Sequence, residues 1–232
     1  MKKLTDARLQ LHWAAQIAAG VGRTLLAPRA DDSHTTFVFS NGVLLQEAFD
    51  GLRAGLRLHD LTLVLGSETL PLCGRTLDDG FAFLESRFGR PLNRPNVDLP
   101  DHPVARGAPF DADLESCETL GGLYAIADSL LREFAAGPVL CWPHHFDIAT
   151  LLTVREGTTI GIGLSPGDAS YPDPYWYVTP WPYPPVASLP ALTRGPWHTT
   201  GWVGAVMPAH GDARVFIEEA VARCRELLRA QT

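Results

Sequence analysis

The stretch HTTFVFSNGVLLQEAF, residues 34–49, combines two β-rich runs with the dipeptide Asn41-Gly42 between them. Asn-Gly between hydrophobic runs is the strongest short-range signal for a β-hairpin, because both residues tolerate the positive φ angles of the tight turn. Further β-rich runs follow at 56–59, 61–65 and 69–72. The pattern predicts a small antiparallel meander.

Helical signals lie on both sides of this meander. Apolar residues recur at helical spacing over 5–26, before Pro28. Thr76 is typical of an N-cap for a helix that runs to Phe88, with Gly89 as its end. Two further helices are predicted over 114–135 and from Asp212 to Leu228.

The C-terminal half alternates β-rich runs with turns, at 139–142, 147–154, 159–164, 175–179 and 200–207. The sum is an α+β fold, with antiparallel sheet or sheets flanked by three or four helices. Five prolines between Arg90 and Phe110 predict a loop. We therefore expect either a single domain over 1–232 or two packed halves, 1–90 and 111–232.

Composition restricts the classes of partner and the compartment. The chain has 26 acidic and 19 basic side chains, and its formal net charge is −7. This excess repels phosphate backbones, so nucleic acid and anionic membranes are poor partners. No apolar run approaches the roughly 20 residues that cross a bilayer. Four scattered cysteines suggest buried thiols in a reducing compartment, and the cytoplasm is the expected location.

Aromatic residues cluster in the stretch from Trp142 to Trp202. This stretch contains five of the six tryptophans and four of the five tyrosines. Aromatic rings with polar tips suit a wall that must also form hydrogen bonds, as in a ligand pocket. An aromatic core strand pair would explain the clustering equally well.

The motif WPHHFD, residues 142–147, provides the candidate chemistry. If the chain is extended from His144, alternation places His145 and Asp147 on one face, roughly 6–7 Å apart. A carboxylate beside an imidazole fixes its tautomer and supports it as a general base or metal ligand. We predict His145, Asp147 and His198 as catalytic residues. A structural histidine and a metal site are competing interpretations.

The expected walls of this site follow from the same aromatic clustering. The predicted ligand-binding residues are Trp142, His144, Asp168, Tyr175, Tyr177, Trp181 and Trp197. Small residues at Gly161 and Gly163 would leave room for a ligand or for a packed ring. The proline-rich segment 171–185 is predicted to be an edge strand or polyproline segment.

Three stretches in this region resemble a family of bacterial proteins that has no established activity. They are WPHHFDIAT (142–150), GIGLSPGD (161–168) and YVTPWP (177–182). The resemblance is strongest over 142–206 and weaker at LHWAAQ (11–16). Because the family has no established activity, it assigns no role to these residues.

Three functional hypotheses follow. The first is a small-molecule site centred on His145, Asp147 and His198. In a catalytic version of this hypothesis, these residues perform acid/base chemistry. The second is a metal-dependent enzyme that uses the same cluster. The third is a non-enzymatic binding or self-assembly module, such as a homodimer, that uses the 171–185 edge. None of them names a cofactor.

Overall fold

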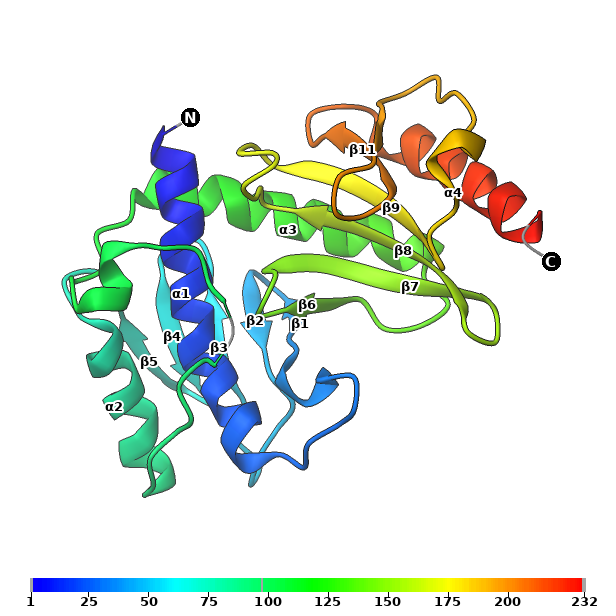
Figure 1. Ribbon diagram of the computed structural model, residues 1–232. Helices are drawn as coiled ribbons and strands as arrows, with labels where there is room; N and C mark the ends of the chain where they lie inside the picture. The colour runs from blue at the N-terminus through cyan, green and yellow to red at the C-terminus, as the bar shows by residue number, and fades with distance from the viewer. Residues whose placement is uncertain (1, 97, 231–232) are drawn as a thin grey trace. The chain divides into compact units, whose positions relative to one another are not determined.

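A computed structural model describes residues 2–96 and 98–230 (Figure 1). Their contacts group into two compact units. Unit 1 comprises Met1–Ala125 and Leu140–Phe146, and unit 2 comprises Ile126–Val139 and Asp147–Thr232. The helix α3 (Leu114–Phe134) contributes residues to both units. The two units are described separately below.

Unit 1 is an antiparallel meander that carries two helices. Its strands follow the order β1-β2-β3-β4-β5. They are β1 (Val38–Ser40), β2 (Val43–Leu45), β3 (Ala54–Arg57), β4 (Thr62–Leu65) and β5 (Glu68–Pro71). At the turn between β1 and β2, Asn41 and Gly42 have φ angles of 49° and 80°, so the predicted hairpin is confirmed.

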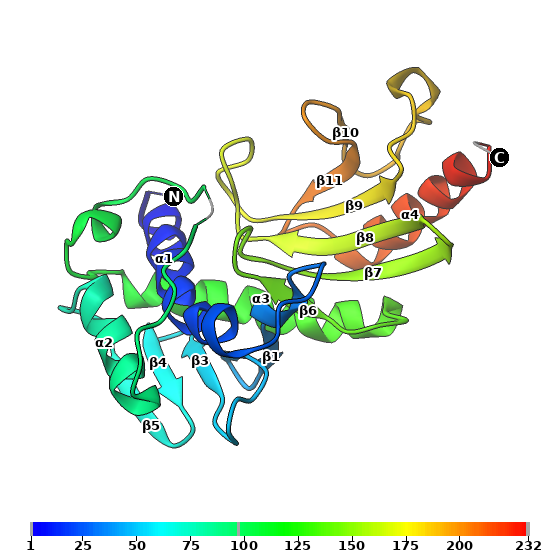
Figure 2. The same cartoon turned by 60° about the horizontal axis from the view of Figure 1, so that its bottom comes forward.

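Both long helices of unit 1 lie on the same face of this sheet (Figures 1 and 2). α1 (Lys2–Leu25) packs on β3 and against α2 (Leu77–Phe88). α1 buries the apolar stripe Leu11, Ala14, Ala15, Ile17, Ala18 and Val21. α2 begins with the predicted cap at Thr76, which exchanges hydrogen bonds with Asp79 in a capping box, and ends at Gly89 with φ 63°.

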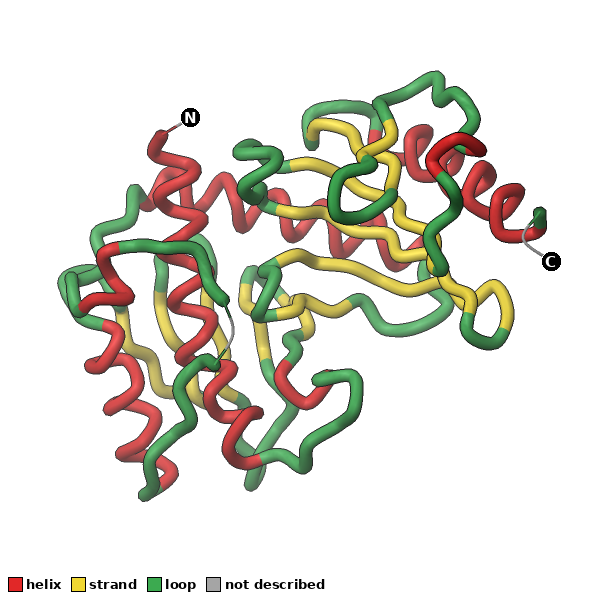
Figure 3. Tube along the Cα trace, in the orientation of Figure 1, coloured by secondary structure: helices red, strands yellow, loops and turns green. Residues whose placement is uncertain are grey.

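Two short helical turns and a short strand complete unit 1. They are η1 (Ser33–Thr35), η2 (Pro103–Arg106) and β6 (Leu140–Trp142). The sequence suggested that residues 34–36 belong to the first strand, but they lie before it, in and just after η1. The proline-rich segment 90–110 lies inside unit 1 and, in its described part, is mainly loop (Figure 3). Cys141 in β6 bridges to Phe37 through two backbone hydrogen bonds.

Unit 2 is an antiparallel sheet packed on a helix. Its strands follow the order β10-β11-β9-β8-β7. They are β7 (Asp147–Arg155), β8 (Thr158–Ser165), β9 (Tyr175–Trp181), β10 (Trp197–His198) and β11 (Gly204–Pro208). α4 (Ala213–Arg229) begins after the predicted cap Asp212 and packs on β9. A further turn, η3 (Val186–Ser188), follows β9.

Segment 171–185 was predicted to be an edge strand or a polyproline segment. The edge-strand prediction was wrong for the part that forms β9, because β9 lies between β8 and β11. The physical reason is the length of β11, which pairs only with residues 175–178. Pro180 pairs with Ile160 of β8 beyond the end of that ladder. A proline there removes no hydrogen bond from the β9–β11 ladder.

The fold class is confirmed as α+β, with α1–α4 and two antiparallel sheets over residues 2–96 and 98–230. Cys117, Cys141 and Cys224 are buried. Burial raises the pKa of Cys117 and Cys224 to about 12, so both thiols are unreactive at neutral pH. In the described part of the chain, no helix is long and apolar enough to cross a membrane.

Candidate functional site

The WPHHF motif forms a tight turn in unit 1. The amides of His145 and Phe146 both donate to the carbonyl of Trp142, at 3.2 and 2.6 Å, and Phe146 has a φ of 56°. The prediction of an extended chain from His144 was therefore wrong, and β7 begins only at Asp147. Pro143 favours the turn, because its fixed φ suits the second position of a reverse turn.

Helix α1 holds this turn through two polar side chains. The Nε2 atoms of His12 and Gln16 lie 2.8 and 2.5 Å from the carbonyl oxygen of Pro143. The His12 ring stacks on Phe146 with centroids 5.2 Å apart. Burial lowers the pKa of His12 to about 4, so the imidazole is neutral and donates from Nε2. The turn is thus fixed by buried hydrogen bonds and by ring stacking.

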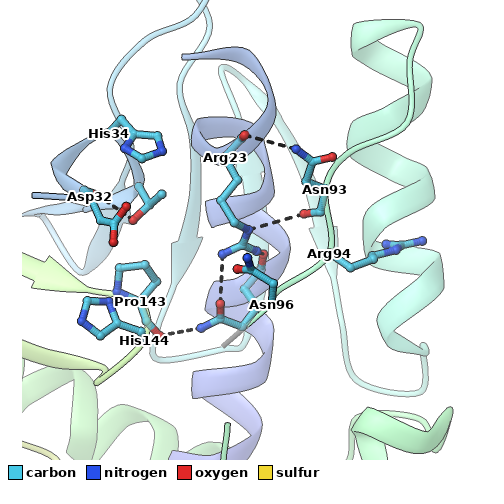
Figure 4. A pocket seen from close by; sticks show the side chains of 10 residues that line it. Arg23, Asp32, His34, Asn93, Arg94, Asn96, Pro143 and His144 are labelled. Atoms are coloured by element: carbon cyan, nitrogen blue, oxygen red, sulfur yellow. Dashed lines mark hydrogen bonds between the residues drawn. The ribbon is translucent and has the colours of Figure 1, made fainter. Parts of the chain in front are cut away.

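A polar cavity of about 440 Å³ lies beside the turn (Figure 4). Helix α1, the turn η1, the loop after α2 and the Pro143 turn all contribute to its walls. The lining residues are Gln16, Arg23, Asp32, His34, Thr35, Asn93, Arg94, Asn96, Pro143 and His144.

Arg23 is the central cation of this cavity. Its Nη1 donates to Gln16 Oε1 at 3.1 Å, its Nη2 to the Gln16 carbonyl at 2.7 Å, and its Nε to the Asn93 carbonyl at 3.4 Å. Among the described residues, no carboxylate forms an ion pair with it. Burial lowers the pKa of Arg23 to about 10, so the guanidinium remains charged at neutral pH.

The wall formed by η1 is anchored to α1 by Gln46, which is fully buried. Its Oε1 accepts from the Gly22 amide at 2.8 Å, and its Nε2 donates to the Thr35 carbonyl at 2.7 Å. His34 accepts a hydrogen bond at Nδ1 from the Arg29 amide, at 3.3 Å. Because this Nδ1 acts as an acceptor, the ring hydrogen of His34 lies on Nε2.

The second cation of the cavity, Arg94, is already neutralised. Its guanidinium carbon lies 3.6 Å from the centroid of the Phe81 ring, and its Nη2 pairs with Asp78 at 3.2 Å. In Figure 4 its side chain extends away from Arg23. Sequence reasoning did not identify Arg23, Arg94 or the two asparagines, because no short motif marks them.

A second polar cluster lies within unit 2 and contains several predicted site residues. The Tyr177 hydroxyl donates to Asp147, and the Tyr175 hydroxyl donates to Asp168 at 2.6 Å. Burial and the hydrogen bond to Asp168 raise the pKa of Tyr175, so this phenol stays protonated. Asp168 also accepts from the amides of Ser170 and Tyr171, and so orders the loop before β9.

His198 joins this cluster through its neighbours. Its Nδ1 lies 3.0 Å from the Tyr171 hydroxyl, and its Nε2 lies 2.7 Å from the Thr200 carbonyl. The ring stacks on Trp202 at 4.5 Å, and Trp202 contacts Tyr177 edge-on at 6.2 Å. Unit 2 thus brings Asp147, Asp168, Tyr175, Tyr177 and His198 into one connected network.

Gly163 supports this network by leaving space for a ring. It pairs with Tyr177 across β8 and β9, and a Cβ at Gly163 would lie 2.5 Å from the Tyr177 ring. Of the two sequence interpretations of these glycines, room for a ligand or for a packed aromatic ring, the second holds at Gly163.

The other predicted residues lie elsewhere. Trp181 is 54% exposed and contacts Tyr183, while the Trp197 indole donates to the Pro190 carbonyl at 2.7 Å. Trp142, His144 and the exposed His145 belong to unit 1. The His144 ring contacts the rings of both Trp142 and His145. Because Asp147 and His198 belong to unit 2, the convergence of His145 with them stays a prediction.

The metal hypothesis gains no support from side-chain placement. Within residues 2–96 and 98–230, no group of three or more His, Cys, Asp or Glu side chains has an arrangement that could hold a metal ion. Comparisons with protein-family models, curated proteins and solved structures give no significant match.

Proposed function

We propose that the protein binds a small polar molecule in the unit 1 cavity. The observation that carries this proposal is the half-buried, charged Arg23 on the wall of a 440 Å³ cavity, with no ion-pair partner among the described residues. A cavity of this volume is in the range of small-molecule sites. Its polar lining favours a ligand that forms hydrogen bonds.

The fixed walls of the cavity support a binding role. Pro143 is held by His12 and Gln16, and Thr35 is held by Gln46. Walls that are fixed before binding lose little conformational entropy when a ligand enters. Pro143 and His144 of the WPHHFD motif line this cavity, whereas the predicted centre His145 is not among its lining residues.

Filling the cavity tests the proposal. Asn96 is exposed, so Asn96→Trp should fold normally while its ring obstructs the cavity. We expect a library of small polar fragments to shift the amide NMR signals of Gln16 and Asn93 in the wild type, and to shift them at least about tenfold more weakly in Asn96→Trp.

The matched control is Ser86→Trp, which adds the same ring to an exposed position of α2 that does not line the cavity. It should bind fragments as the wild type does. Fragment-induced shifts that survive Asn96→Trp unchanged, or that map to other residues, would contradict the proposal.

Acid/base catalysis by His145, Asp147 and His198 has less support. Both ring nitrogens of His198 already have partners, the Tyr171 hydroxyl and the Thr200 carbonyl. A general base needs a nitrogen that can reach the proton of a substrate. The cluster of unit 2 therefore favours a structural role for His198 over proton transfer.

A second candidate function is self-association through the end of β9 and the segment that follows it. Trp181, Tyr183 and Val186 are 54%, 42% and 55% exposed. Large apolar side chains exposed close together in sequence are typical of interaction surfaces. We infer that this segment could pair two copies of the chain.

Sedimentation velocity tests self-association. We expect the wild-type chain to sediment as a dimer and the double variant Trp181→Ser/Val186→Ser as a monomer, because the substitutions remove the exposed apolar surface. The control is Leu151→Ser, which removes another exposed apolar side chain, 57% exposed, from β7. A monomeric wild type, or equal masses for all variants, would rule this candidate out.

A further inference from the structure

We propose that the ligand of the unit 1 cavity is a small organic or inorganic acid, and that its carboxylate or phosphate group pairs with Arg23. This inference rests on the proposed function and specifies its ligand chemistry. It is drawn from the distribution of charges and of hydrogen-bond donors on the cavity wall.

The charge distribution leaves Arg23 to be neutralised by a ligand. A charged group that is removed from water is costly unless an opposite charge pairs with it. The other cation, Arg94, pairs with Asp78 and stacks on Phe81. Asp32 is the acidic residue among the lining residues, and it forms no ion pair with Arg23. An anionic ligand would supply the paired negative charge that Arg23 lacks.

The hydrogen-bond donors indicate the same class of ligand. A guanidinium has five N–H groups, and three of those in Arg23 are used by Gln16 and Asn93. One N–H on each terminal nitrogen remains, and this number matches the two oxygens of a carboxylate or two oxygens of a phosphate.

Two neighbours add to this donor set. The Asn96 side-chain amide lies beside the Arg23 guanidinium in Figure 4. Because Nδ1 of His34 accepts from the Arg29 amide, the ring carries its hydrogen on Nε2. Gln16 adds no donor, because its Nε2 donates to the carbonyls of Pro143 and His12, at 2.5 and 3.5 Å. Together these groups favour a ligand with several acceptor oxygens.

Calorimetric titration with sodium acetate, sodium succinate and sodium phosphate tests the inference, at constant ionic strength set with sodium chloride. Acetamide serves as the uncharged analogue of acetate. We expect at least one of the three anions to bind, and acetamide to bind at least about tenfold more weakly than acetate if acetate is that anion. Binding of succinate or acetate alone identifies a carboxylate site, and binding of phosphate alone identifies a phosphate site.

Substitutions locate the binding site. Arg23→Gln should reduce the affinity of the bound anion about 10- to 100-fold, the loss expected for a charge-assisted pair. Arg23→Lys should retain part of the affinity, because the charge remains but the fork of donors is lost. Arg87→Gln is the matched control, since it removes the same charge from an exposed ion pair with Glu68 outside the cavity.

Two further measurements keep the inference falsifiable. If Arg23→Gln fails to fold, Asn96→Ala at an exposed position replaces it, and a loss of about threefold or more is expected. The inference is overturned if none of the anions binds, or if they bind equally to Arg23→Gln and Arg87→Gln. If neutral fragments still bind in the cavity, the proposed function survives that result; if neither anions nor fragments bind there, both proposals fail.

Discussion

Replacing Gly22 with alanine is expected to lower the free energy of unfolding by about 3 kcal/mol, the upper part of the range for overpacked sites. A Cβ at Gly22 would lie 2.3 Å from the His34 carbonyl oxygen and 2.9 Å from Gln46 Nε2. A backbone carbonyl cannot rotate away, so η1 would have to separate from α1. The cost exceeds the gain of about 1 kcal/mol that alanine offers over glycine in a helix.

The control is Gly122→Ala in α3, where nothing lies within 4 Å of an added Cβ. This variant should be more stable than the wild type by about 0.5–1 kcal/mol. Urea denaturation of the three proteins measures both effects. Because η1 forms a wall of the cavity, Gly22→Ala should also lower the affinity for any ligand that binds to Arg23 and His34. Similar stabilities for the two variants would show that α1 and η1 are not in the close contact described.

The largest pH effect is expected from His12, whose side chain is buried beside Pro143 and Phe146. Burial is the largest cause that lowers its pKa from 6.5 to about 4, and the nearby Arg8 guanidinium lowers it further. Between these two values the unfolded chain binds more protons than the folded chain. The free energy of unfolding should therefore rise by about 3 kcal/mol as the pH rises through this window.

Denaturation curves recorded at pH values between about 4 and 7 measure this slope. His12→Gln should be less stable near neutral pH, because it loses the stacking on Phe146, and its slope should be flatter. His59→Gln is the control, since His59 is exposed, with 55% of its side chain accessible, and its slope should match the wild type. If His12→Gln shows the same pH dependence of the free energy of unfolding as the wild type, a group other than His12 causes that dependence.

Elements with strong local signals were predictable from the sequence. The Asn41-Gly42 hairpin, the Thr76 and Asp212 caps and the end at Gly89 depend on the chemistry of a few neighbouring residues. The turn at 142–146 was missed because strand alternation was applied from His144 onward, directly after Pro143. That proline was itself the local sign of a turn.

The candidate sites differ in how far they could be foreseen. Several members of the unit 2 network lie within one aromatic stretch, so Asp168, Tyr175, Tyr177 and His198 were predictable as candidates. The unit 1 cavity depends on Arg23 and Pro143, which lie far apart in sequence. Nothing local to Arg23 distinguishes it from a surface arginine at a helix end, and only the folded chain shows that it is half-buried on a cavity wall.

The distance along the chain between His12 and Pro143 has a consequence for biosynthesis. The two residues are separated by 131 positions, and Leu140–Phe146 is part of unit 1. Helix α1 therefore leaves the ribosome with a histidine and a glutamine whose acceptor has not been translated. Until the Pro143 turn emerges, this face of α1 must remain hydrated or be held by a chaperone. In a fragment that ends at residue 125, His12 and Gln16 would still lack the Pro143 acceptor. A separate peptide spanning 140–146 would have to bind to this fragment to supply it.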